Sequence, residues 1–493
     1  MVLFPYAEDC TIWRRRRNGK YPTNHGLHDL YLLICEGLIR SWMTYSTGAH
    51  KTVYRRQCLP LQLRFMKTRI DNEQNNSRTM RALTFVRFMR QILKSGPADL
   101  DWIQSQGLLA VKLAQIFALR SDLLSVEKCR QLQQLYQHAS SIPSEEVFDN
   151  LEKRAPEGFF DAFEEIDKIP IAAASVGQVH RARLKTGEEV VIKVIKAQNE
   201  KSFRRDVKRM RRWLRIFLLF MPKLRKVGNP VALLNHVADY TTRELDLRNE
   251  IAGADELKNI QLDIDDTFQM HRLRFPKYYR ELSNEQVLVS EFIRGDSLED
   301  GIEGGTLSWS TLLDLFRIHG AYLFGIGTFH GDLHPGNCII DEDGMFVFID
   351  NGAICHAPTH VSSSLFRFFE HLSASQLNDA FEALLGLSEE TLDDRRKEKY
   401  MARMYEIYHD FEMLSVGEQS LTQIMMKTVR CAVEDAGAVF GEEAFPIIRA
   451  LMYLDGLVIR THPDVKLIQS MSPYLEEFRA CLPIPEPVSP YSK

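Results

Sequence analysis

The chain has 493 residues, 45% of them hydrophobic and 26% charged, and its net charge is -4 at pH 7. This length excludes a single small domain, and the composition predicts a globular protein with an ample core in two or three lobes. The charge is unevenly spread: residues 1–96 hold 17 Lys and Arg against 6 Asp and Glu, and the acidic remainder argues against a protein devoted to nucleic acid.

The cysteines and the apolar stretches bear on the compartment. Eight cysteines form no C-x-x-C pair and no zinc-ligand spacing, so we expect a reducing environment. The first residues show no basic region followed by an apolar core and a cleavage site, and no secretory signal is predicted. The most apolar stretches, 30–39 and 213–221, are shorter than the roughly 20 residues that span a bilayer. We therefore predict a cytoplasmic protein with at most peripheral membrane contact.

The first part of the chain reads as helical. Residues 1–95 form a basic, poorly defined helical region with irregular apolar spacing. Residues 96–165 form a helical extension, because apolar residues recur at intervals of three and four over 101–152. Within it, Ser144 is placed to cap a new helix.

Residues 166–295 change from the helical period to strands. A hairpin is predicted over 176–184 and 190–195, where β-branched runs flank a Gly turn. A third strand is predicted over 285–293, and a long helix lies between them over 231–257. This part of the chain is expected to be a small β-rich N-lobe.

The remainder is mainly helical. Residues 296–480 contain a small hairpin that turns at Asp343 and Gly344, followed by helices from about 360 to 478, and the Pro-rich residues 481–493 are expected to be a flexible tail. The fold class is therefore α+β, with a small β-rich lobe before a larger helical lobe.

A run of small residues precedes the first hairpin. It contains Ala172, Ala173, Ala174, Ser175 and Gly177. Small side chains let the backbone approach a ligand closely, and exposed N–H groups at such a turn can cradle phosphate oxygens. The alternative interpretation is a tight packing corner.

Lys193 lies in the middle of the apolar strand VVIKV. It is either an outward or edge-strand residue or a phosphate ligand that needs a carboxylate partner from a helix. Glu244 and Glu250 in TTRELDLRNE are the candidate partners. Asp246 lies between them, and on one helix Glu244 and Asp246 point about 200° apart, so the three carboxylates cannot all serve one lysine. A solvent-facing helix with internal charge pairs is the competing interpretation.

The stretch HGDLHPGN concentrates polar residues beside a strand. Asp332 and Asn337 are five residues apart, and Asp350 follows the strand MFVFI. Two aspartates and an asparagine brought together by a hairpin supply oxygen ligands for Mg²⁺ and a carboxylate that orients a hydroxyl or a water. We expect His330 and His334 to hold the backbone of this turn by hydrogen bonds.

The order of these parts is that of a protein-kinase-like fold. The segments AAASVGQVHRA, VVIKV, ELDLRNE, FHGDLHPGN and FIDNGAI resemble the UbiB (AarF-domain) family of atypical kinases over roughly residues 100–475. The segment VKLAQIFALRSDLLS resembles the K-x-G-Q extension of the same family.

The resemblance implies a role for each matching position. The loop from Ala172 through Val176 to Gln178 would be the Ala-rich phosphate loop. Lys193 would contact the α and β phosphates of ATP and pair with Glu244 or Glu250, and the hinge-like SEFIRG would place Glu291 and Ile293 beside the nucleotide.

The remaining positions carry catalysis and its regulation in this resemblance. Asp332 would be the catalytic aspartate, with Asn337 and Asp350 as Mg²⁺ ligands. Lys112 and Gln115 would belong to an extension that folds over the nucleotide site and hinders protein substrates.

The chain departs from the family pattern at three positions. Ala114 replaces the glycine of K-x-G-Q, Asn351 replaces the apolar middle residue of D-F-G, and Gly331 replaces the usual alanine before Asp332. Asn351 puts an amide where an apolar side chain usually packs behind the metal-binding aspartate.

The predicted function is an ATP- and Mg²⁺-binding ATPase or small-molecule kinase that supports ubiquinone or other isoprenoid-lipid metabolism. The alternatives are a nucleotide-gated scaffold with little turnover and, ranked last, a general protein kinase. The expected partners are ATP, a lipid-like substrate and a biosynthetic complex. Residues 201–226 hold eleven basic residues against one aspartate, so an anionic membrane surface is a further candidate partner.

Overall fold

The computed structural model describes most of the chain after residue 81. The described ranges are 82–94, 96–118, 124–137, 142–173, 176–220, 230–388, 393–411, 414–438, 440 and 444–481. They divide into two compact units. The described part of one unit lies in Arg81–Arg90 and Met210–Leu233, and the other unit comprises Gln91–Arg209 and Leu234–Lys493 together with Arg78–Met80. The predictions for residues 1–81 and for the tail beyond 481 lie outside the described residues.

Among the described residues, four helices precede the first sheet in the larger unit, whereas the sequence predicted a helical pattern over 101–152 with a new helix starting near Ser144. They are α5 (Leu100–Ser105), α6 (Leu108–Ala118), α7 (Val126–Gln137) and α8 (Ser144–Arg154). Gly107 separates α5 from α6 with a φ of 93°, a left-handed conformation that favours glycine. The predicted cap at Ser144 is wrong by one position, because Pro143 is the N-cap of α8 and makes no side-chain cap bond.

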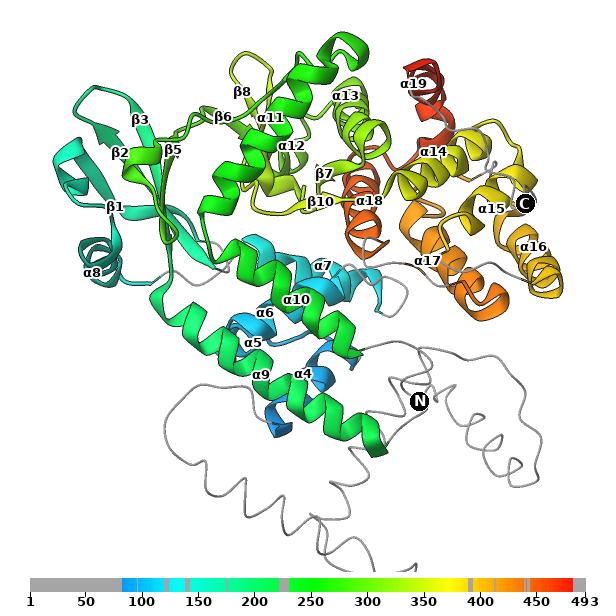
Figure 1. Ribbon diagram of the computed structural model, residues 1–493, viewed down its shortest axis with the longest axis horizontal. Helices are drawn as coiled ribbons and strands as arrows, with labels where there is room; N and C mark the ends of the chain where they lie inside the picture. Colours follow the sequence, from blue (N-terminus) through cyan, green and yellow to red (C-terminus); the bar gives the residue numbers. More distant parts are fainter. Residues whose placement is uncertain are drawn as a thin grey trace, which may run out of the picture. The chain divides into compact units, whose positions relative to one another are not determined.

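An antiparallel sheet of four strands forms the small lobe (Figure 1). Its order is β1 (Phe163–Ala173), β2 (Gly177–Leu184), β3 (Glu189–Ile195) and β5 (Val287–Glu291). The predicted hairpin and third strand are present with slightly different bounds. The edge strand β1 was not predicted as far back as Phe163, because most of its residues are exposed and its burial does not alternate.

The core of this lobe lies between the sheet and helix α8. Buried aliphatic residues of β3 and β5 pack there against Val147 and Leu151 of α8. Since β3 lies between β2 and β5, every side chain of β3 is flanked by two neighbouring strands.

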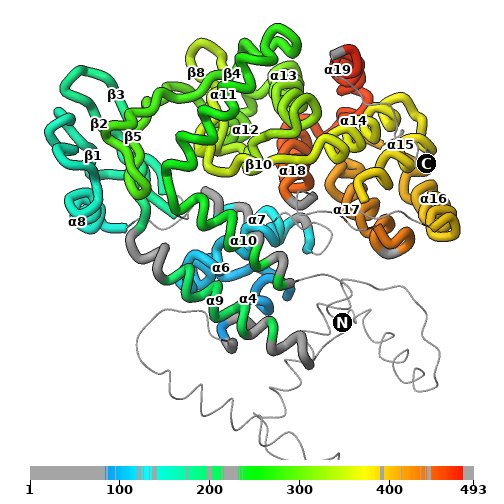
Figure 2. The backbone as a smooth tube through the Cα atoms, in the orientation of Figure 1, coloured from blue at the N-terminus to red at the C-terminus, as the bar shows by residue number. Residues whose placement is uncertain are grey.

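The long helix predicted over 231–257 is two helices. Helix α10 (Pro230–Glu244) ends at Glu244, and α11 (Arg248–Phe268) begins after a short turn. Leu245 and Leu247 in that turn are buried. Figure 2 follows the backbone from α10 through this turn into α11. Two further helices are α4 (Ala82–Leu93) and α9 (Ala197–Phe220).

Short strands surround the predicted polar loop. Strands β4 (Leu273–Arg274), β9 (Phe346–Phe348), β8 (Cys338–Asp341) and β6 (Gly295–Ser297) form one sheet in this order, and β7 (Thr328–His330) pairs with β10 (Ile354–His356). The predicted turn between β8 and β9 is present: Asp341 Oδ1 accepts hydrogen bonds from the amides of Asp343 and Met345 at 3.1 and 2.8 Å.

The rest of the larger unit is helical, as the sequence predicted. Its helices are α12 (Leu298–Glu303), α13 (Trp309–Gly320), α14 (Thr359–Ser373), α15 (Leu377–Leu385), α16 (Asp394–Tyr408), α17 (Leu421–Cys431), α18 (Ala444–Thr461) and α19 (Leu467–Cys481). Short 3-10 and π segments complete it at Phe159–Ala162, Arg280–Leu282, Ala321–Ile326, Pro335–Asn337 and Ala432–Ala436. Their core is aromatic, with Tyr322, Phe366 and Tyr400 fully buried. Among the described residues, no helix is both long enough and apolar enough to cross a bilayer.

Candidate active site

Lys193 is buried in the middle of the small sheet. Its Nζ lies 2.8 Å from Glu250 Oε2 and 2.8 Å from Asp350 Oδ1. Burial favours the neutral amine, but the charges of Asp350 and Glu250 outweigh it and raise the pKa of Lys193 above its ordinary value. The interpretation of Lys193 as an outward residue is therefore wrong, and the lysine is a buried cation held between two carboxylates.

Glu244 faces a different lysine. Lys112 Nζ of α6 lies 2.7 Å from Glu244 Oε1 and 2.5 Å from Oε2, and both side chains are buried. Burial raises the pKa of Glu244, and Lys112 opposes that shift. The two acidic candidates thus serve two lysines, because the break between α10 and α11 turns them apart. Asp246 between them pairs instead with exposed Arg248.

The polar loop at Asp332 is held by its own side chains. The Asp332 amide donates to His330 Nδ1 at 3.2 Å, and the Gly336 amide donates to His334 Nδ1 at 3.1 Å. The predicted role of both histidines in holding the turn is confirmed. Asn337 Nδ2 donates to the Asp332 carbonyl at 3.0 Å, which leaves the amide oxygen of Asn337 available as a ligand.

Three residues that the sequence did not single out surround the Asp332 carboxylate. Tyr453 Oη donates to Asp332 Oδ1 at 2.7 Å, and Tyr240 Oη donates to Asp332 Oδ2. Arg449 Nε donates to the Gly331 carbonyl at 2.7 Å, and its guanidinium lies 4.4 Å from the centre of the Tyr240 ring. Lys112 Nζ lies 5.3 Å from the same ring centre.

The sequence carried a weak signal for this cluster. Arg449 and Tyr453 are four residues apart in the apolar helix α18, so they share one face and mark a polar spot in a buried helix. No local pattern linked that spot to Asp332, which lies far away in the chain.

The charged groups around Asp332 determine whether its carboxyl group is protonated. Burial pushes the pKa of Asp332 up, but the Arg449 guanidinium, followed by His334 and Lys112, outweighs burial and holds the pKa well below its usual range. Asp332 is therefore a carboxylate at neutral pH, as a proton acceptor must be.

Asp350 occupies a left-handed backbone conformation, with φ at 56°. Its amide donates to the Glu250 carboxylate, and its own side chain is 36% exposed. Burial raises the pKa of Asp350, but the charge and hydrogen bond of Lys193 outweigh burial and lower that pKa below its ordinary value. A non-glycine residue with such a φ is uncommon and is held there by its surroundings.

Asn337 and Asp350 remain the candidate metal ligands that the sequence predicted. Within the described ranges, no group of three or more His, Cys, Asp or Glu residues is placed to bind one. One carboxylate and one amide oxygen nevertheless fit Mg²⁺, because this ion is bound through one or two protein oxygens together with substrate phosphates.

The predicted phosphate loop is only partly described. Ala172 and Ala173 end β1, Val176 and Gly177 lead into β2, and Ala174 and Ser175 lie outside the described residues. A Cβ atom at Gly177 would lie 2.9 Å from the Val194 carbonyl oxygen, so the position requires glycine.

The side chain of Gln178 is not among the clustered residues. Its Oε1 accepts from the Ile142 amide at 2.8 Å, and its Nε2 lies 3.0 Å from His180 Nε2. In the hinge-like segment, Glu291 is bound by Arg274 at 3.1 Å and Ile293 is buried. Gln115 of the extension donates to the Leu135 carbonyl at 3.0 Å and so joins α6 to α7, and Ala114 is buried beside it.

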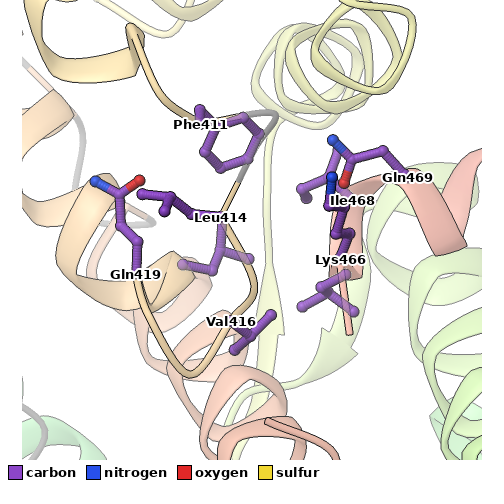
Figure 3. A pocket seen from close by; sticks show the side chains of 9 residues that line it. Phe411, Leu414, Val416, Gln419, Lys466, Ile468 and Gln469 are labelled. Atoms are coloured by element: carbon purple, nitrogen blue, oxygen red, sulfur yellow. The ribbon is translucent and has the colours of Figure 1, made fainter. Parts of the chain in front are cut away.

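Gly331 fits its surroundings closely. A Cβ atom there would lie 2.3 Å from Cys355 Sγ, so the glycine accommodates the cysteine on the paired strand. A separate small pocket lies between the segment before α17 and the start of α19, where Phe411, Val416 and Ile468 line it (Figure 3). It includes none of the residues described above.

Comparisons with known proteins identify the family of the chain. The ABC1 atypical kinase-like domain matches residues 134–384, just over half of the chain. The chain is 27% identical over 381 residues to Protein ACTIVITY OF BC1 COMPLEX KINASE 7, chloroplastic, of Arabidopsis thaliana, covering 74% of this chain and 52% of that protein. It is 26% identical over 392 residues to Probable protein kinase UbiB of Vibrio parahaemolyticus, covering 76% and 69%.

A solved structure, that of the Rv3197–erythromycin complex from Mycobacterium tuberculosis, matches with a TM-score of 0.49 at 17% identity, covering 84% of this chain and 97% of that one. This chain spans about half the length of the Arabidopsis relative. Since the matched domain takes in both the Lys193 strand and the Asp332 loop, the chain belongs to the ABC1 atypical kinase-like family and has a protein-kinase-like α+β fold, as its sequence predicted.

Proposed function

We propose that this protein binds ATP and Mg²⁺ and acts as an ATPase or a small-molecule kinase. The observation that carries the proposal is the placement of Lys193 between Glu250 and Asp350, 2.8 Å from each. Phosphoryl transfer needs positioning and charge neutralisation more than covalent chemistry from the protein, and a buried, charged lysine beside a partly exposed aspartate supplies both.

Each clustered residue has a role in this proposal. Lys193 binds the α and β phosphates, and Glu250 keeps its ammonium group in place. Asn337 and Asp350 hold Mg²⁺, which neutralises phosphate charge when bound. Asp332 accepts the proton of the attacking hydroxyl or water, and Tyr453 orients its carboxylate. Lys112 and Glu244 fix α6 against α10 next to this group.

We infer a lipid-related acceptor from the relatives. Several of them are named Probable protein kinase UbiB, which supports a role in ubiquinone or other isoprenoid-lipid metabolism. Exposed basic residues of α9 support contact with an anionic membrane surface. They include Lys208, Arg212 and Arg215.

A second candidate function is a nucleotide-gated scaffold with little turnover. The observation that favours it is the engagement of both Asp332 oxygens by the hydroxyls of Tyr240 and Tyr453. In this arrangement both oxygens of Asp332 already accept a hydrogen bond from a tyrosine, so an acceptor hydroxyl competes with these tyrosines for the carboxylate.

Phosphate release from Mg²⁺-ATP separates the two functions. The full chain is assayed with and without anionic liposomes, beside Asp332→Asn and the control Asp343→Asn in the exposed turn between β8 and β9. An ATPase loses release in Asp332→Asn, keeps it in the control, and retains thermal stabilisation by nucleotide in both. Stabilisation by nucleotide without release under any condition supports the scaffold, and transfer to peptides would favour a general protein kinase.

A further inference from the structure

Asn351 stands where an apolar residue is expected, directly after Asp350. Its exposed fraction is 0%. Its Nδ2 donates to the Phe348 carbonyl at 2.8 Å and to Tyr278 Oη at 3.3 Å, whereas its Oδ1 has no hydrogen-bond partner in the described part of the chain. A buried amide oxygen without a partner is unfavourable, so an apolar residue would pack here at lower cost unless the amide bonds had a use.

Tyr278 reaches Asn351 from the small lobe. Its backbone forms a β-bridge with Ser290 of β5, the strand next to the one that carries Lys193. Burial, followed by the nearby charge of Glu250, raises the pKa of Tyr278, so its hydroxyl is neutral and can accept the Asn351 N–H. The bond between Asn351 and Tyr278 therefore ties the loop of Asp350 to the lobe of Lys193.

Helix α11 closes the other side of this loop. A Cβ atom at Gly253 would lie 2.0 Å from the Asn351 carbonyl oxygen and 2.7 Å from Ile354 Cγ1, so the helix backbone lies directly against the loop. One turn earlier, Glu250 accepts the Asp350 amide. Three groups therefore hold Asn351 in place: the backbone of α11, the Phe348 carbonyl at the end of β9, and the Tyr278 hydroxyl.

We propose that Asn351 and Tyr278 form a positioning pair that holds Asp350 in its left-handed conformation, with the carboxylate between Lys193 and the metal position. In the D-F-G pattern the middle residue makes an apolar contact behind the metal-binding aspartate. In this chain the hydrogen bonds of Asn351 hold the loop instead. The metal part of this inference rests on the proposed function. The holding of the loop does not.

Hydrogen exchange of the full chain without nucleotide tests the holding directly. The protected amides of the loop are those of Ile349, bound to the Asn337 carbonyl at 3.0 Å, and of Asp350. Tyr278→Phe removes one hydroxyl and keeps the ring. We expect both amides to exchange about fivefold faster, the effect of losing one hydrogen bond. The matched control is Tyr279→Phe, one residue along, whose ring is buried in the small-lobe core.

Binding of Mn²⁺ in the presence of ADP, followed by the paramagnetic resonance of free Mn²⁺, tests the metal part. We expect Tyr278→Phe and Asn351→Leu each to weaken Mn²⁺ binding about fivefold, and the double variant to be no weaker than either single one, because the two residues act as a unit. If Asn351→Leu does not fold, the Mn²⁺ affinity of Tyr278→Phe alone tests the metal part of the inference.

The outcomes separate this inference from the proposed function. Unchanged exchange and unchanged Mn²⁺ affinity in Tyr278→Phe overturn the positioning pair, and so do equal effects in Tyr279→Phe. Wild-type protein that binds no Mn²⁺ with ADP refutes the proposed function, and the exchange measurement then still decides whether the pair holds the loop.

Discussion

At the scale of single residues, the Asp332 carboxylate has more partners than a proton acceptor needs. Two tyrosine hydroxyls donate to it, and Arg449 lies beside it without a direct ion pair. Tyr453 and Arg449 come from one face of α18, whereas Tyr240 comes from α10. We interpret the α18 residues as fixed support and Tyr240 as the group that must yield to an acceptor.

Replacing Arg449 should change the pH dependence of phosphate release. Arg449 is the main group that opposes burial in holding the Asp332 pKa low. In Arg449→Gln that pKa rises, so activity is lost at a higher pH on the acid side than in the wild type. Arg449→Lys keeps the charge and should restore most of the profile. Exposed Arg460, on the same helix and paired with half-buried Glu299, supplies the control Arg460→Gln. An acid limb that does not move in Arg449→Gln would show that Arg449 acts only by holding the Gly331 carbonyl.

Replacing the two tyrosines should have opposite effects on turnover. Tyr240→Phe frees Asp332 Oδ2 for the acceptor, and we expect kcat to rise several-fold. Tyr453→Phe removes the hydrogen bond that orients the carboxylate, and we expect kcat to fall by about tenfold. Steady-state phosphate release measures both. A fall in Tyr240→Phe as deep as that in Asp332→Asn would mean that Tyr240 takes part in the reaction.

At the scale of elements, α11 determines the geometry of the site. It carries Glu250 to Lys193, and at Gly253 its backbone lies against the Asn351 carbonyl. A side chain at position 253 would clash with the loop and displace the helix away from it. The separation of Lys193 from Asp350 therefore depends on one glycine in the middle of a helix.

Gly253→Ala should accordingly destabilise the protein, although alanine is the better helix former. We expect the free energy of unfolding to fall by about 1–3 kcal/mol, the usual cost of overpacking. The matched control is Gly456→Ala in α18, where a Cβ atom meets nothing within 4 Å and a gain of about 0.5–1 kcal/mol is expected. Urea unfolding of both variants measures the difference. Equal gains in the two would contradict the close packing of α11.

Helix α9 is the element that we propose to contact anionic lipid. Lys208, Arg212 and Arg215 lie at helical spacing and are exposed. Changing all three to Glu should weaken flotation with anionic vesicles at least tenfold, since each basic residue near such a surface contributes about 1 kcal/mol. The control changes three exposed basic residues elsewhere to Glu. They are Lys258, Arg395 and Lys427. Equal losses of flotation in both variants would show that binding depends on the net charge of the protein and not on the position of these residues.

The elements also show why some features followed from the sequence and others did not. Strands β3 and β5 are buried and rich in β-branched residues, so their pattern was visible, whereas the exposed edge strand β1 offered no alternation. The break after Glu244 contains no Gly or Pro and could not be located from local propensity. The assignment of Glu244 to Lys112 and of Glu250 to Lys193 depends on that break. Arg449 and Tyr453 reach Asp332 only through the packing of α18, which no local signal reports.

At the scale of the whole molecule, two buried histidines affect its stability toward acid. His319 and His330 are almost fully buried, and neither ring nitrogen of His319 has a hydrogen-bond partner among the described residues. Burial lowers the pKa of His319 to about 3 and that of His330 to about 4. In the unfolded chain both titrate near 6.5. The unfolded state therefore binds protons first, and the free energy of unfolding falls as the pH drops from about 6.5 toward 4.

Removing His319 should weaken this pH dependence. Between pH 7 and pH 5, His319 alone lowers the free energy of unfolding by about 2 kcal/mol, since its pKa in the unfolded chain lies well above its pKa in the folded protein. His319→Leu has no ring to protonate, and its urea midpoint should shift less between these two pH values than that of the wild type. The exposed His360→Leu should keep the wild-type shift. If His319→Leu also keeps it, protonation of this buried ring does not limit stability in acid, and His330 becomes the residue to replace.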